Sequence, residues 1–267
     1  MKVAVIGGGN MGSTYARAFV RSNIVKKEDL LIIERHAPKR EELEKEDLAI
    51  VTEEIGKSIG EYDVIIVAVK PQDFKATAEE VKKFLKKKQL VLSIMAGIKI
   101  KTIQKLLDHE KVVRAMPNTP AQLGFGITAF SAAKDQSYES ISVVDTLLET
   151  TGKSIFMKNE DQLDAVTALS GSGPAYFYYF VKHMIEAGKE MGIDEPVASL
   201  LVKQTMLGSF QIMNNSRASL DEMIKAVASK GGTTEAALNT FEEKKVGESI
   251  KTALKAAEKR AKELSKE

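Results

Sequence analysis

Residues 2–12 of the chain read KVAVIGGGNMG, and this stretch decides the fold of the N-terminal half. Its apolar start is typical of a short buried strand, while the residues that follow, up to Arg21, carry a helical pattern. The glycines match the spacing G-x-G-x-x-G at a strand-to-helix junction. In that motif they permit a tight turn, close approach of a pyrophosphate and close helix packing. The sequence therefore predicts a dinucleotide-binding unit, whose contacts are Gly7, Gly9, Asn10, Met11 and Gly12.

Strand and helix patterns alternate from this stretch up to about residue 157. The expected strands are continuously apolar, which is typical of a parallel sheet covered by helices on both faces. We therefore predict an α/β Rossmann domain over residues 1–157, with a doubly wound and mainly parallel sheet. The expected strands are residues 2–6, 30–33, 48–51, 63–69, 90–95, 112–116, 125–131 and 154–157, and the expected helices are residues 11–21, 38–43, 77–88 and 137–150.

The second half, residues 158–267, carries helical patterns only. Helices are expected at about residues 161–168, 175–191, 196–214, 220–227, 234–241 and 246–264. They are long and apolar for a region of this size, which favours packing against a second copy of the chain. We therefore predict an all-α C-terminal dimerisation domain.

Composition argues against several classes of function. The 39 basic and 37 acidic residues leave a net charge of +2, which gives no electrostatic basis for binding nucleic acid or an acidic membrane. Cysteine is absent and the three histidines are far apart in sequence, so no metal site and no thiolate nucleophile are expected. The apolar start is too short for a signal peptide and no run is long enough to span a bilayer, so a cytoplasmic protein is expected.

The end of the second expected strand gives conflicting evidence on the nucleotide. Glu34 stands 22 residues after Gly12, where an acidic side chain usually binds the ribose 2′-hydroxyl of NADH. Arg35 follows it, with Lys39 and Arg40 close behind, and such cations can bind the 2′-phosphate of NADPH. Both cofactors therefore stay open, and charged residues of no function at a helix start are the alternative.

Other candidates lie where the later strands end, since ligands of doubly wound sheets bind at the carboxyl ends of the strands. The fourth strand ends in Ala68, Val69, Lys70 and Pro71, which we expect beside the cofactor. Ala96, after the next strand, is interpreted in the same way, and Asn118, between two prolines, is expected near the nicotinamide. Each of these segments also fits an ordinary turn.

Two segments rich in small residues open helices in the second half. They read SGSGPAY (residues 170–176) and SKGGTTE (residues 229–235). Free N–H groups at a helix start suit a carboxylate, so both segments are candidate anion sites. A helix break without function is the alternative for the second segment.

The segments described above, in the order in which they occur along the chain, resemble the pyrroline-5-carboxylate reductase family. The resemblance covers essentially the whole chain. The resemblance is carried by the glycine loop, AVKP (68–71), NTP (118–120), LSGSGPAY (169–176) and, most specifically, ASKGGTTEAA (228–237). It implies reduction of 1-pyrroline-5-carboxylate to L-proline with NADPH or NADH, helical domains interleaved in a dimer, and dimers that often build a decamer. It also implies a substrate site with Thr234 as the candidate catalytic side chain. The site residues are Glu160, Ser170, Gly171, Ser172, Gly231, Gly232, Thr233 and Thr234.

Two residues depart from the family's usual pattern. Glu34 stands where a small or amide residue is common, which puts a strict NADPH preference in doubt, and Lys230 stands where many members have proline. A β-hydroxyacid dehydrogenase is the alternative enzyme, but it requires a lysine with an asparagine one turn later. Lys182 is followed by Glu186 at that spacing, which does not fit. A non-catalytic nucleotide-binding regulator is the alternative outside enzymes.

Overall fold

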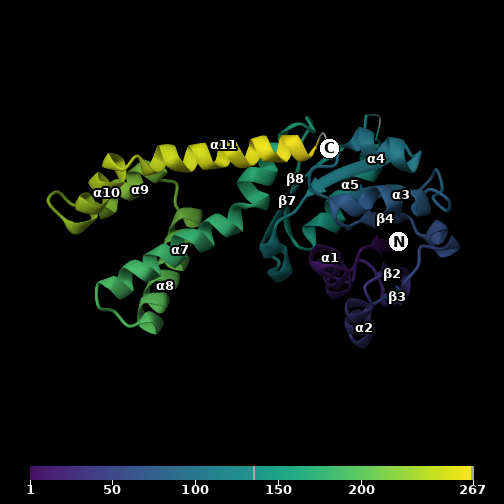
Figure 1. The fold of residues 1–267 in the computed structure, drawn as a ribbon, viewed down its shortest axis with the longest axis horizontal. Helices are drawn as coiled ribbons and strands as arrows, with labels where there is room; N and C mark the ends of the chain where they lie inside the picture. The colour runs from purple at the N-terminus through teal and green to yellow at the C-terminus, as the bar shows by residue number, and fades with distance from the viewer. Residues whose placement is uncertain (135, 266–267) are drawn as a thin grey trace. The chain divides into compact units, whose positions relative to one another are not determined.

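The computed structural model describes residues 1–134 and 136–265 of the chain (Figure 1). Its contacts divide the chain into two compact units. The sheet unit comprises Met1–Gly173 together with the residues from Ala257 onward, and the helical unit comprises Pro174–Ala256. The last strand ends at Phe156, close to the residue where the sequence pattern changes, whereas the compact units divide later, after Gly173.

One eight-stranded sheet forms the centre of the sheet unit, in the order β3-β2-β1-β4-β5-β6-β7-β8. Neighbouring strands pair in parallel except β6 and β7, which are antiparallel. The chain winds outward in both directions from β1, so the predicted doubly wound, mainly parallel sheet is confirmed. The strands are β1 Val3–Ile6, β2 Leu30–Ile33, β3 Ile50–Thr52, β4 Val64–Val67, β5 Leu90–Ser93, β6 Val112–Met116, β7 Gly126–Ala132 and β8 Gly152–Phe156.

Helices connect the strands, as the alternating pattern predicts (Figure 1). The helix expected over residues 77–88 instead begins at Phe74 and ends at Val81, and the chain then turns where the side chain of Gln89 accepts the N–H of Lys86 at 2.6 Å. Helix α4 was not predicted, although three apolar residues one turn apart give it a buried face. The helices are α1 Asn10–Arg21, α2 Ala37–Lys45, α3 Phe74–Val81, α4 Ile100–Leu107, α5 Tyr138–Glu149 and α6 Gln162–Val166.

The central strands of the sheet are buried on both faces. Alternate residues of β1 belong to different apolar clusters, with Val3 and Val5 in one and Ala4 and Ile6 in the other. Every residue of β1, β2, β4 and β5 is buried, which explains why these strands read as continuous apolar sequence. The sheet unit therefore completes its core within one chain.

The register brings the carboxyl ends of several strands to one edge of the sheet. Ile6 pairs with Ile33 on one side and with Val67 on the other. Val67 pairs with Ser93, and Ser93 pairs with Arg114 near the end of β6. The glycine loop after β1 and the segments after β2, β4, β5 and β6 therefore lie at the edge where doubly wound sheets bind ligands.

The helical unit consists of helices joined by turns, as predicted. They are α7 Gly173–Glu190, α8 Glu195–Asn215, α9 Leu220–Val227, α10 Thr233–Glu243 and α11 Val246–Leu264, of which the first and last continue into the sheet unit. Many large apolar side chains of this unit are exposed, among them Phe177, Tyr178, Leu200, Leu207, Phe210 and Ile212. Apolar surface of this extent is typical of an interface. Among the described residues, none of the helices combines the length and the apolar character that crossing a membrane requires.

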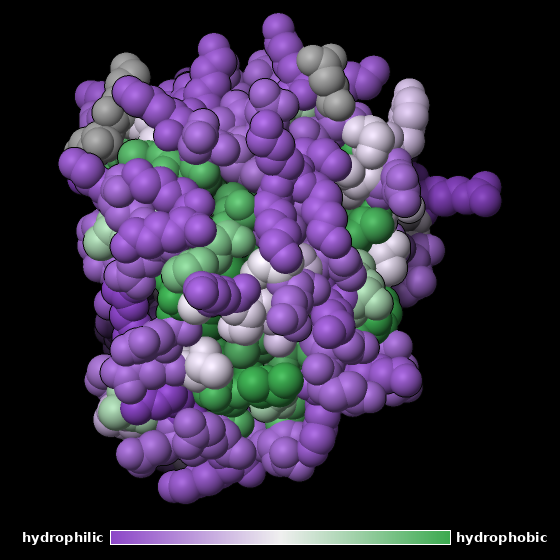
Figure 2. All heavy atoms as spheres, turned by 90° about the vertical axis from the view of Figure 1, so that its right-hand side faces the viewer, coloured by the Kyte–Doolittle hydropathy of each residue, from purple (hydrophilic) through white to green (hydrophobic). Residues whose placement is uncertain are grey.

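The surface of the sheet unit has a different character. Figure 2 shows one of its faces, which is mostly covered by hydrophilic side chains. Apolar side chains reach this face mainly in a central band. Such a surface is normal for a region that has its own core.

Candidate functional site

The glycine loop between β1 and α1 is tightly packed at two of its glycines and open at a third. A Cβ on Gly7 would lie 2.8 Å from the carbonyl oxygen of Ala68, and one on Gly12 would lie 2.0 Å from that of Gly7. Gly7 also has a φ of +102°, which other residues rarely adopt. A Cβ on Gly9 would meet no described atom within 4 Å. The space over Gly9 is therefore free for a ligand, as the G-x-G-x-x-G motif requires.

Helix α1 begins beside this open space. Its N-cap is Gly9, none of the described side chains caps its N–H groups, and its first turn contains no acidic residue. Free N–H groups and the positive end of the helix dipole attract an anion. The loop and the helix start together fit a pyrophosphate.

A cavity of about 680 Å³ lies at this edge of the sheet. It brings together seven of the residues predicted to bind a cofactor: Gly7, Gly9, Glu34, Arg35, Ala68, Val69 and Lys70. The other lining residues are Ile6, Ile33, His36, Ile55, Gln72, Asp73, Ala76 and Thr77. A mixed apolar and polar cleft of this size is typical of a small-molecule or cofactor site.

Glu34 stands at the rim of this cavity, directly after β2. Its Oε2 accepts the N–H of Gly8 at 2.9 Å, and its Oε1 accepts the N–H of His36 at 2.8 Å. The backbone of the glycine loop and that of the strand end therefore fix the carboxylate. A carboxylate offers about four acceptor positions, so some remain for the hydroxyl groups of a ligand.

The basic residues near Glu34 have carboxylate partners. Arg35 lies 2.5 Å from Glu80 of α3, and Arg40 lies 3.1 Å from Glu53. Lys39 lies 2.8 Å from a glutamate one turn along α2. These pairs are near the surface and individually weak, but each cation shares its charge with an acid of the same chain.

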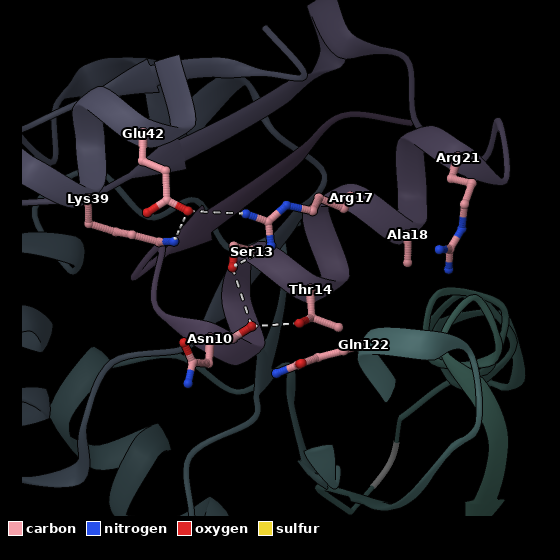
Figure 3. A pocket seen from close by; sticks show the side chains of 9 residues that line it. All are labelled: Asn10, Ser13, Thr14, Arg17, Ala18, Arg21, Lys39, Glu42 and Gln122. Atoms are coloured by element: carbon pink, nitrogen blue, oxygen red, sulfur yellow. Dashed lines mark hydrogen bonds and ion pairs between the residues drawn. The ribbon is translucent and has the colours of Figure 1, made fainter. Parts of the chain in front are cut away.

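A second hollow, of about 310 Å³, is lined by residues of α1, α2 and the 3₁₀ turn Thr119–Leu123. Figure 3 shows the side chains of Arg17, Lys39 and Glu42 pointing toward one another across it. Glu42 lies 2.8 Å from Lys39 and 3.8 Å from Arg17, and Arg17 lies 2.6 Å from Glu46, so both of these cations are paired with acids of α2 or the residue after it. Asn10, predicted as a cofactor contact, lines this hollow and not the larger cavity.

Other predicted cofactor residues lie at the same edge without lining the cavity. Met11 and Gly12 are in the first turn of α1, Pro71 opens the 3₁₀ turn Pro71–Asp73, and Ala96 lies in the turn after β5. Conversely, four lining residues around the start of α3 were not predicted: Gln72, Asp73, Ala76 and Thr77. The expected start of that helix was placed too late, although Pro71 is a signal for a helical turn.

Asn118 connects the sheet edge to the first small-residue segment of the second half. Its side chain accepts the N–H of Ile127 at 3.0 Å and donates to Oγ of Ser170 at 3.2 Å. Gly171 lies against the end of β6, where a Cβ would come 2.4 Å from Cε of Met116. Two segments predicted as separate parts of the site are therefore in contact at this edge.

The segment around Ser170 is not a simple helix start, which corrects the sequence interpretation. Helix α6 continues into a π-helical turn, Thr167–Gly171, and α7 begins at Gly173. The N–H of Ser172 donates to the carbonyl of Thr167 at 2.9 Å, so it is not free for a ligand. π-Helical turns are rare and frequently occur at functional sites.

The second small-residue segment lies in the helical unit and opens α10, as predicted. Gly231 has a φ of +73°, which favours glycine, and Gly232 is the N-cap of the helix. The N–H of Gly231 donates to the carboxylate of Glu235 at 2.7 Å. Thr233 and Thr234 form the first turn, where none of the described side chains caps the N–H groups at the N-cap.

Glu160, predicted near the substrate, belongs to a buried ion cluster of the sheet unit. The guanidinium of Arg114, which is 1% exposed, lies 3.2 Å from Glu160 and 2.9 Å from Asp164. Glu160 also accepts the N–H of Ile100 at 2.7 Å, and Asp164 accepts the hydroxyl of Ser265 at 3.1 Å. The cluster therefore connects β6, α4 and α6 with Ser265, which follows α11. Sequence analysis missed Arg114, although an arginine inside an apolar strand signals a buried partner.

Comparison with known proteins covers the whole chain. The family model described as pyrroline-5-carboxylate reductase dimerisation matches residues 160–264, and the model described as NADP oxidoreductase, coenzyme F420-dependent, matches residues 2–97. A pyrroline-5-carboxylate reductase of Pseudomonas aeruginosa is 34% identical over 100% of this chain and 97% of that protein. One from Arabidopsis thaliana is 32% identical over 99% of this chain and 95% of that protein.

Solved structures agree with these relationships. A pyrroline-5-carboxylate reductase of Coxiella burnetii gives a TM-score of 0.89 at 31% identity, covering 99% of this chain and 98% of that one. A Plasmodium falciparum pyrroline carboxylate reductase with NADP bound gives 0.89 at 27% identity, with the same coverage. The match to a dimerisation model agrees with the exposed apolar helices, and the helical unit is therefore a region of self-association.

Proposed function

The chain belongs to the pyrroline-5-carboxylate reductase family, and we propose on this basis that it reduces 1-pyrroline-5-carboxylate to L-proline with NADH or NADPH. The observation that carries the proposal is the cavity at the carboxyl edge of the sheet, which the glycine loop, Glu34 and the segment after β4 line together. The two small-residue segments of the second half supply the substrate side. One contacts Asn118 at this edge, and the other opens α10.

The residues around the cavity fit a nicotinamide dinucleotide. The open space over Gly9 and the uncapped start of α1 hold its pyrophosphate. Glu34 binds ribose hydroxyls through the acceptor positions that Gly8 and His36 leave free. When bound, the cofactor supplies the hydride that reduces the C=N bond. The backbone of Ala68 and Val69, and the turn that holds Ala96, flank it at the strand ends.

The substrate is a cyclic imine that carries a carboxylate. A protonated imine is a better hydride acceptor than a neutral one, so the protein has to position the ring and stabilise its charge more than supply a strong acid. That requirement agrees with a chain that has no cysteine and three histidines.

The start of α10 binds the substrate carboxylate. Gly231 and Gly232 shape the turn, and Thr233 and Thr234 present the N–H groups and hydroxyls of the first helical turn to the anion. The hydroxyl of Thr234 accepts a hydrogen bond from the protonated imine nitrogen, or relays a proton to that nitrogen from a water molecule that restores the hydroxyl. Ser170, Gly171 and Ser172 of the sheet unit are further substrate contacts in this proposal, as is Glu160, which forms an ion pair with buried Arg114.

The helical unit forms an interleaved dimer with a second copy, and dimers assemble further into a decamer. Support for the dimer comes from the exposed apolar side chains of α7 and α8 and from the match to a dimerisation model. The decamer follows from the resemblance to the family. Sedimentation velocity separates the two sizes, and a single dimeric species at all concentrations would contradict the larger assembly.

Oxidation of NADH and of NADPH, followed by absorbance with 1-pyrroline-5-carboxylate as the substrate, tests the reductase activity. Turnover with either cofactor is the expected result. A protein that binds nucleotide but gives no turnover with either would overturn the proposal and favour a regulator.

The role of Thr234 is tested by a pair of variants. Thr234→Ala should lower kcat/KM by about a hundredfold or more, because a side chain that assists proton transfer typically contributes about 10²–10⁴-fold. Thr234→Ser keeps the hydroxyl and should retain most of the activity. An alanine variant as active as the unmodified chain would remove Thr234 from the proton step.

A further inference from the structure

We propose that this chain selects NADH over NADPH, and that Glu80 is a specificity residue that acts by holding Arg35. The inference rests on the proposed use of a nicotinamide cofactor and deepens it. It concerns the side of the cavity where β2 ends, because the adenosine ribose binds there in dinucleotide-binding units.

Glu34 provides the first part of the argument. Its two oxygens accept the N–H groups of Gly8 and His36, so the carboxylate cannot turn away without breaking two bonds to the backbone. The 2′-hydroxyl of NADH can donate to it. A 2′-phosphate carries about −1.5 to −2 charges at neutral pH, so NADPH brings a like charge to this fixed carboxylate.

Arg35 directly follows Glu34 in the sequence and also lines the cavity. Its guanidinium is the expected partner for a 2′-phosphate. Its Nη2 lies 2.5 Å from Oε2 of Glu80. Glu80 stands one turn along α3 from Ala76, which itself lines the cavity. A phosphate therefore has to draw Arg35 away from Glu80 or accept a second carboxylate nearby, and both weaken the binding of NADPH.

Neighbouring cations do not replace Arg35. Arg40 donates to the carbonyl oxygens of Glu34 and Arg35 at 3.3 and 3.4 Å and lies 3.1 Å from Glu53. Lys70 also lines the cavity, but it follows β4, which is separated from β2 by β1. The charges beside Glu34 are thus already shared among groups of the chain.

Equilibrium binding of NADH and NADPH to the full chain, measured by fluorescence without substrate, tests the inference. The unmodified chain should bind NADH about tenfold more tightly or better, as expected when a phosphate meets a fixed carboxylate. Glu80→Gln keeps the size of the side chain and removes its charge. It should tighten NADPH binding by about fivefold and leave NADH binding nearly unchanged, because a freed Arg35 can contact the phosphate.

The double variant Glu80→Gln with Arg35→Gln is the matched control. It should lose the gain in NADPH affinity, since that gain acts through the guanidinium. Glu80 is the better position to change than Glu34, because Glu34 also anchors the glycine loop whereas the Arg35–Glu80 pair is about half exposed.

Three results would overturn the inference: NADPH bound as tightly as NADH by the unmodified chain, no gain from Glu80→Gln, or a gain that survives Arg35→Gln. Turnover of 1-pyrroline-5-carboxylate is measured separately. Absence of turnover together with an intact NADH preference would contradict the reductase activity and support the nucleotide selectivity proposed for Glu34 and Glu80.

Discussion

The two units of this chain are both rich in apolar residues but bury them to very different extents. In the sheet unit, every residue of β1, β2, β4 and β5 is buried. In helix α8 of the helical unit, Ala198 is buried, while Leu200, Leu207 and Phe210 are 68%, 54% and 52% exposed. The difference shows where the packing partner comes from. The sheet unit finds it within its own chain, and the helical unit requires a second copy.

The largest effect is expected from a charge placed on the exposed apolar surface of the helical unit, because this tests whether that surface packs against a second copy. Leu207→Lys should weaken self-association by about a hundredfold or more, because an unpaired charge in an apolar interface costs several kcal/mol. Sedimentation velocity over a range of protein concentrations measures the change. Ile50→Lys makes the same kind of change at an apolar residue of the sheet unit that is 47% exposed, and it should leave association unaltered. A Leu207 variant that associates normally would place α8 outside the interface.

The next largest effect is expected inside the sheet unit. Arg114→Met leaves the carboxylates of Glu160 and Asp164 without their buried partner, which should lower the free energy of unfolding by about 3–5 kcal/mol. Denaturant unfolding measures it. Lys99→Met is the control, because its pair with Asp161 at 2.9 Å is largely exposed and should contribute much less. Equal losses for the two variants would contradict a buried, coupled cluster.

The smallest effect is a pH dependence of the sheet unit. His109 is 7% exposed and contacts the carbonyl of Gln89 at 2.8 Å, and burial lowers the pKa of His109 below its usual 6.5. Below pH 6.5 the unfolded chain takes up a proton that the folded chain does not, so stability should decrease as the pH falls toward the lowered pKa. Thermal unfolding between pH 7.5 and 5.5 checks the slope, and His109→Gln should flatten it. An unchanged slope in the variant would assign the effect to other groups.

The central strands β1, β2, β4 and β5 could be predicted because they are buried on both faces and therefore read as nearly uninterrupted apolar runs. The site could be predicted in part, since the glycines and the residues at strand ends follow local rules. Contacts between distant residues could not. Arg35 and Glu80 are 45 positions apart, and Asn118 and Ser170 are 52 apart, and no periodic pattern encodes either pair.

Two further errors concerned where helices begin. Helix α3 was expected only from residue 77, and four residues around its start that line the cavity, Gln72, Asp73, Ala76 and Thr77, were not assigned to it. The segment around Ser170 was interpreted as a helix start because small residues and a proline usually mark one. Its π-helical turn packs closely against Met116 of β6, so that Gly171 has no room for a Cβ, and this contact is not visible in sequence.

The hydrogen bond between Ser265 and Asp164 joins residues 101 positions apart, and the whole helical unit lies between them. Ribosomes add about 5–20 residues per second, so Asp164 is synthesised roughly 5–20 seconds before Ser265. During that interval the nascent sheet unit lacks this closing contact, while the helical unit with its apolar side chains is being made. Translation thus sets the order of events: closure of the sheet unit by Ser265 comes after the surface that recruits a second chain has been made.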